Sequence, residues 1–64
     1  MKLNIRKIQL ELERLGWSKS KLAREMGVTR QCIHYYFHNK RNIGLETVTN
    51  IGKTLGIPAK DLIE

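Results

Sequence analysis

One stretch of this chain, residues 22–37, constrains the fold more than any other. It reads LAREMGVTRQCIHYYF, a short helical pattern followed by a tight turn and a second helical pattern. Three apolar residues of the first half have the spacing of one helical stripe: Leu22, Ala23 and Met26. Gly27 stands where a left-handed residue ends a helix, and Thr29 is a suitable N-cap for the next one. The pattern predicts two short helices joined by a tight turn.

The second helical pattern, Thr29–Phe37, has two different sides. Ile33 and Tyr36 lie on the apolar side. The other side carries a guanidinium, an amide, an imidazole and a phenol, from Arg30, Gln31, His34 and Tyr35. Such groups match the hydrogen-bond patterns on base edges, whereas Lys and Glu would be enough for solubility. From this helix alone, a simpler interpretation is also possible: the polar side could be an ordinary solvated surface without a binding function.

The size and charge of the chain restrict its possible functions. Its 64 residues are enough for one domain, 1–64, and leave no room for a buried catalytic cleft with a lid. The net charge of +6 favours a polyanionic partner, of which nucleic acid is the commonest. We expect no membrane association, because the helices are short and evenly amphipathic. The single cysteine, Cys32, excludes an internal disulfide and favours a reducing, cytoplasmic location.

Three further helices are expected outside residues 22–37. The first runs from Leu3 to Leu15, with an inward stripe of Ile5, Ile8, Leu12 and Leu15. Leu3 and Leu10 are expected on its opposite side. Another runs from Leu45 to Leu55, with inward Leu45, Val48, Ile51 and Leu55. The sequence AKDLIE after Pro58 is expected to add one or two helical turns. In the loop after Phe37, Asn39 is the residue best suited to a left-handed conformation. The predicted class is all-α, with five short helices around one core.

A longer pattern of characteristic residues at fixed spacings runs from Trp17 to Ile63. It comprises Leu22-Ala23, Met26-Gly27-Val28-Thr29, Ile33, Asn42, Leu45-Glu46-Thr47, and Leu55-Gly56-Ile57 ahead of Asp61-Leu62. This pattern resembles the Cro/repressor-type (Xre) helix-turn-helix family of phage and bacterial regulators. The resemblance implies a lambda-repressor-like domain in which helices 2 and 3 form the helix-turn-helix and Thr29–Phe37 lies in the major groove. Three positions depart from the family pattern: Phe37 replaces a usual Glu, Asn39 a usual Gly, and Ile43 a frequent Pro.

The resemblance also implies roles for individual residues. Arg30, Gln31 and Tyr35 would face bases, and His34 would lie between bases and backbone. Phosphate contacts would come from Lys19, Thr29, His38, Lys40 and Arg41. The implied function is a sequence-specific double-stranded DNA-binding transcriptional regulator, a repressor, in the bacterial cytoplasm and associated with the nucleoid.

One recognition helix reads too few base pairs for a genome-scale site, so we expect a homodimer on a palindromic operator. Its dimerisation can be weak without DNA. The interface is expected at Leu62 and Ile63 or in the loop before Leu45.

The sequence also allows functions other than DNA binding. His34 and His38 have a spacing that two metal ligands can use, but a structural zinc needs four ligands, so no metal is expected. Cys32 lacks acid–base partners, and we expect neither an enzyme nor a cofactor. The main alternative is a helix-turn-helix protein-interaction module such as an antitoxin, and a third is a nonspecific nucleic-acid binder. The basic residues expected around this helix (Lys19, Arg30, Lys40 and Arg41) and the mixed side chains on Thr29–Phe37 favour sequence-specific DNA binding instead.

Overall fold

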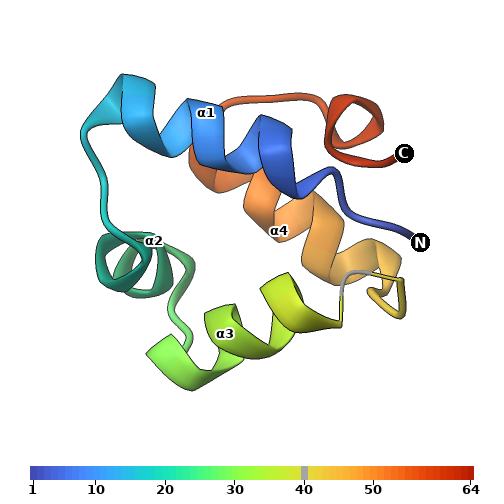
Figure 1. The fold of residues 1–64 in the computed structure, drawn as a ribbon, viewed down its shortest axis with the longest axis horizontal. Coiled ribbons are helices and arrows are strands. Elements are labelled where there is room, and N and C mark those ends of the chain that lie inside the picture. Colours follow the sequence, from blue (N-terminus) through green and yellow to red (C-terminus); the bar gives the residue numbers. More distant parts are fainter. Residues whose placement is uncertain (40) are drawn as a thin grey trace.

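The computed structural model describes residues 1–39 and 41–64. Within these ranges the chain forms four α-helices and one 3-10 turn. They are α1 (Ile5–Leu15), α2 (Lys19–Met26), α3 (Arg30–His38), α4 (Leu45–Leu55) and the turn η1 (Ala59–Leu62). Figure 1 shows α1 and α3 on opposite sides of the molecule, with α2 joining them at one end. The predicted all-α class is confirmed, but the prediction of five helices is wrong in its last member.

The last element is a 3-10 turn because tertiary pairing takes the chain out of the helix. The N–H of Asp61 donates to the carbonyl of Pro58 at 3.0 Å, a bond across three residues. Ile63 is then extended, with φ −117° and ψ 152°. It forms an antiparallel bridge with Leu3. The AKDLIE segment therefore has room for a single turn only.

The same pairing corrects the prediction for the N-terminus. The first helix begins at Ile5 rather than Leu3, and the side chain of Asn4 caps it by accepting from the N–H of Lys7. Leu3 is fully buried, so its expected place on the exposed side is wrong. The N–H of Asn4 donates to the carbonyl of Leu62 at 2.7 Å, which holds the two ends of the chain side by side (Figure 1). Leu10 is exposed, as predicted.

One apolar cluster fills the space between the helices. Its buried members are Leu3, Ile8, Leu12, Leu22, Ala23, Met26, Ile33, Ile43, Val48, Ile51, Leu55 and Leu62. Leu45 was expected among them, and that prediction is wrong, because its side chain is 59% exposed. Leu45 is the first residue of α4, and the preceding loop buries Ile43. In the part of the chain that the structure describes, no helix is both long and apolar enough to span a membrane.

Candidate nucleic-acid interface

Local capping interactions set the geometry of α2, the turn and α3. The hydroxyl of Ser18 accepts from the N–H of Lys21 at 3.1 Å and begins α2. Gly27 ends it with φ 73°, a conformation that costs a residue with a Cβ atom more than it costs glycine. The hydroxyl of Thr29 then accepts from the N–H of Cys32 at 3.1 Å and begins α3. The predicted helix-ending role of Gly27 and the predicted N-cap at Thr29 are confirmed, so local signals set where α2 ends and α3 begins.

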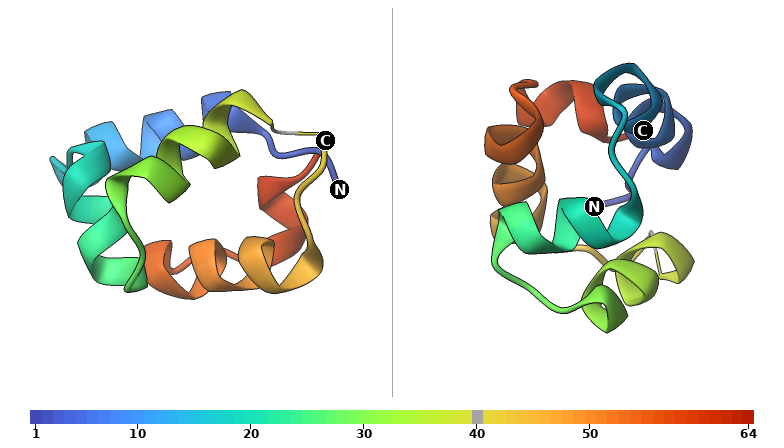
Figure 2. Two further views of the ribbon diagram at one scale, coloured as in Figure 1. Left: turned by 90° about the horizontal axis from the view of Figure 1, so that it is seen from below. Right: turned by 90° about the vertical axis from the view of Figure 1, so that its left-hand side faces the viewer.

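The two predicted sides of α3 are present in the structure. Ile33 is 1% exposed, and Tyr36 and Phe37 pack partly buried against the core. The four side chains expected to read bases are all exposed: Arg30, Gln31, His34 and Tyr35. In the left panel of Figure 2 the molecule is seen from below, and α3 lies on the near side. The side chains expected to read bases are therefore free to meet a partner.

Two imidazoles extend this exposed side toward the end of α3. The rings of His34 and His38 stack with their centroids 3.9 Å apart. The Nδ1 atom of His38 lies 2.9 Å from the carbonyl oxygen of His34. No cluster of three or more potential metal ligands occurs among the described residues.

A contact between α2 and α3 positions one of the predicted phosphate ligands. The Nζ atom of Lys19, at the start of α2, lies 4.7 Å from the centroid of the Phe37 ring. A cation over an aromatic face is attracted by the negative charge of the π system. Phe37 is the residue that replaces the usual Glu of the family pattern. It therefore holds Lys19 beside α3 while leaving its positive charge unneutralised.

The end of α3 brings two further predicted residues together. His38 and Arg41 line one small pocket of about 200 Å³, together with Asn39 and Asn42. Asn39 was expected to be left-handed, and that prediction is wrong, because its φ is −113°. Its backbone and side-chain N–H groups both donate to the carbonyl of Tyr35, so α3 is capped without a positive φ. The predicted phosphate contact at Lys40 lies outside the described residues.

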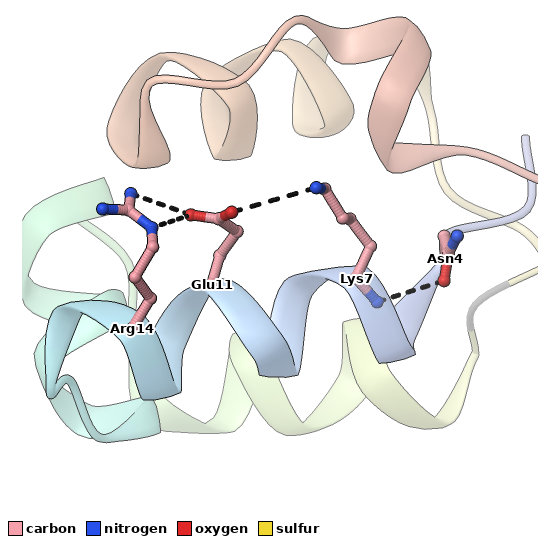
Figure 3. A network of polar contacts seen from close by, with 4 residues as sticks. All are labelled: Asn4, Lys7, Glu11 and Arg14. Carbon is pink, nitrogen blue, oxygen red and sulfur yellow. Dashed lines mark hydrogen bonds and ion pairs between the residues drawn. The ribbon is translucent and has the colours of Figure 1, made fainter.

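The charge around α3 is of one sign. The segment 26–45 contains no Asp or Glu. On α1, in contrast, two basic side chains are paired with one acid, since Lys7 and Arg14 both approach Glu11 (Figure 3). No ion pair within the described residues involves Lys19, Arg30 or Arg41. The cations around α3 are therefore available to a negatively charged partner.

Comparison with known proteins places this arrangement in a family. A family model described as helix-turn-helix matches residues 8–62. The chain belongs to the Cro/repressor-type (Xre) helix-turn-helix family. It is also 34% identical over 56 residues to the "Control protein C.BamHI" of Bacillus amyloliquefaciens, covering 88% of this chain and 69% of that protein. No solved structure matches the chain significantly.

Membership of the Xre family agrees with the geometry of the site. In this helix-turn-helix family, α3 occupies the position of the recognition helix and α2 precedes it. The family and the control-protein relative identify a regulatory DNA-binding protein rather than an enzyme. The sequence missed Asn39 and Asn42 as members of the pocket at the end of α3. Only their position within two residues of Arg41 could have indicated them.

Proposed function

We propose that this protein is a sequence-specific transcriptional regulator that represses by binding double-stranded DNA with α3 in the major groove. The observation that supports this most is the exposed side of α3, where donors and acceptors lie among unpaired cations and no carboxylate. A carboxylate there would repel phosphate, whereas this face attracts the backbone and then contacts bases. The match to a control protein supports a regulatory role.

The contacts divide into two classes. Arg30 and Gln31 lie in the first turn of α3, where a guanidinium can bind guanine and an amide can bind adenine, each through two hydrogen bonds. His34 and Tyr35 follow on the same side. The phosphate contacts come from Lys19, Thr29, His38, Lys40 and Arg41. The first class selects the sequence, and the second sets the register of the protein on the duplex.

The functional unit is a homodimer on a palindromic operator, with half-sites about one helical turn apart. A single α3 contacts only a few base pairs, and two copies double the length of sequence that is read. The protein acts in the bacterial cytoplasm, on the nucleoid.

Selection of bound duplexes from a random library tests the proposed function directly. The expected result is an enriched motif with twofold symmetry. Fluorescence titration of the enriched duplex at three salt concentrations should then show log Kd rising linearly with log salt, with a slope of about 0.9 for each of about four to six phosphate contacts per protomer. Equal affinity for random and enriched duplexes, or an affinity independent of salt, would contradict the proposal.

A further inference from the structure

The only two histidines of this chain stand next to each other on α3. His34 and His38 are both exposed, and their rings stack with centroids 3.9 Å apart. Imidazole is the side chain whose charge ordinarily changes between pH 5 and 8. The exposed side of α3 therefore combines the proposed DNA contacts with a pair of groups that can respond to pH near neutrality.

A hydrogen bond to the backbone fixes which nitrogen of the His38 ring carries a proton. Its Nδ1 atom lies 2.9 Å from the carbonyl oxygen of His34. A carbonyl oxygen only accepts hydrogen bonds, so Nδ1 is the donor and holds an N–H. In the neutral ring the other nitrogen, Nε2, then has a lone pair and no hydrogen. Neutral His38 can accept a hydrogen bond at Nε2 but cannot donate one there.

A phosphate contact at His38 requires a second proton on its ring. Phosphate oxygens are negatively charged acceptors and offer no hydrogen to the lone pair of Nε2. Protonation converts Nε2 into a charged donor, while Nδ1 keeps its bond to the carbonyl of His34. Hydrogen bonds between a charged donor and a phosphate oxygen are roughly twice as strong as neutral ones. In this position His38 is therefore a phosphate ligand only as an imidazolium.

No acidic side chain of the described residues supplies a negative partner for that imidazolium. Neither ring takes part in an ion pair within these residues. On α2, Glu25 is paired with Lys21 at 3.6 Å. On α1, Glu11 is held by two basic residues of its own helix, and Glu13 is exposed. Glu46 at the start of α4 is exposed as well, and neither it nor Glu13 is paired with an imidazole.

The charged groups on the segments next to the pair are positive. Arg30 lies one turn before His34 on α3, and Arg41 lines the same pocket as His38. Lys19 at the start of α2 lies over an aromatic ring of α3. The N-terminal amine donates to the carbonyl of Ile43 at 2.9 Å, in the loop that follows. A phosphate at this end of α3 would supply the negative partner that an imidazolium here lacks within the described chain.

We infer that this protein takes up a proton at His38 when it binds DNA, so that its affinity for DNA rises as the pH falls from about 8 to 6. The contact is complete at the acidic end of this range and is lost as the pH rises. Two positive rings 3.9 Å apart would repel each other, which limits the uptake to about one proton per protomer. The inference rests on the proposed function and adds a regulator of it, because the proton concentration sets the strength of one phosphate contact.

The pH dependence of binding to the enriched duplex tests the inference. Fluorescence titrations at about pH 6, 7 and 8, all at one ionic strength, give the dissociation constant. For wild type this constant should fall about tenfold per protomer between pH 8 and pH 6, the effect of one hydrogen bond from a charged donor. A dissociation constant that changes by less than about twofold would overturn the inference.

Glutamine substitutions identify the ring that takes up the proton. His38→Gln supplies an amide N–H that donates without titrating, so its affinity should change by less than about twofold over the same pH range. His34→Gln is the matched control, the same change one turn earlier on the same side of α3. It removes a proposed base contact and should lower affinity at every pH, but it should keep the response of about tenfold. An unchanged response in His38→Gln, or a response lost only in His34→Gln, contradicts the assignment to His38.

Calorimetry counts the protons directly. Titration of the enriched duplex at about pH 7, in two buffers with different ionisation enthalpies, gives the number of protons taken up on binding. Wild type and His34→Gln should take up about half a proton or more per protomer, and His38→Gln close to none. A merely structural role of His38 would lower affinity without changing this number. Equal uptake by wild type and His38→Gln would therefore overturn the inference.

The inference and the proposed function fail in different ways. If no duplex is enriched at any of these pH values, the proposed function fails and the inference falls with it. If a duplex is enriched but bound equally well at pH 6 and pH 8, only the inference fails. The contact between two copies is the same in all of these variants, so its contribution cancels in the comparison. Leu62 was expected at that contact, and this prediction is wrong because its side chain is fully buried.

Discussion

The helices α3 and α4 are built alike on their buried sides and differ on their exposed sides. Ile33 of α3 and Ile51 of α4 are each 1% exposed and belong to the same core. The exposed side of α3 carries hydrogen-bonding groups and cations without a carboxylate. The exposed side of α4 carries one charge of each sign beside Leu45. A face of one charge sign suits a polyanion, whereas a face that carries both signs does not attract a polyanion in the same way.

The largest expected effect is a loss of stability, and it should be the same for truncation of a buried residue on either α3 or α4. Ile33→Ala and Ile51→Ala each remove a buried side chain and should lower the free energy of unfolding by about 2–5 kcal/mol. A domain of this size has little stability to lose, so both variants should be partly unfolded at 37 °C. Urea denaturation monitored by circular dichroism measures the change. Tyr35→Ala on the exposed side of α3 is the control and should stay within about 0.5 kcal/mol of wild type.

The next effect distinguishes a glycine packed inside α4 from the glycine that precedes this helix. A Cβ atom on the buried Gly52 would lie 2.6 Å from the carbonyl oxygen of Ile57, so the backbone has to move. Gly52→Ala should therefore cost about 1–3 kcal/mol of unfolding free energy. At Gly44, just before α4, an added Cβ meets nothing within 4 Å. Gly44→Ala should change stability by less than about 0.5 kcal/mol, and equal melting temperatures for the two variants would contradict this packing argument.

A binding experiment tests the two classes of contact proposed around α3. Arg30→Ala and Gln31→Ala should each cost about 1–3 kcal/mol of binding free energy and relax the preference at one base pair. Arg41→Ala should weaken all sequences about equally and lower the salt slope by about one. Affinities for a panel of single-base variants of the enriched duplex separate these patterns. If all three variants show the same pattern across the panel, the assignment of base and phosphate roles is wrong.

The sequence predicted the helix-turn-helix well because its signals are local. Gly27 and Thr29 act within one turn of chain, and the spacing of polar residues on α3 follows from helical geometry alone. The sequence failed where distant segments meet. The burial of Leu3 depends on its bridge to Ile63, sixty residues away, and periodicity carries no information about such pairing. The exposure of Leu45 likewise depends on Ile43 entering the core.

The smallest expected effect concerns the aromatic ring of Phe37, over which the Nζ atom of Lys19 lies. Phe37→Leu keeps an apolar side chain against the core and removes only the aromatic face, so stability should fall by less than about 1.5 kcal/mol. The cation–π contact at 4.7 Å holds Lys19 beside α3. Its loss should lower DNA affinity by about 0.5–1 kcal/mol, or two- to fivefold. Lys19→Met supplies the second arm of a double-mutant cycle. In the Lys19→Met background, Phe37→Leu should have no further effect on affinity. If it lowers affinity equally in both backgrounds, Phe37 acts through packing of α3 and not through Lys19.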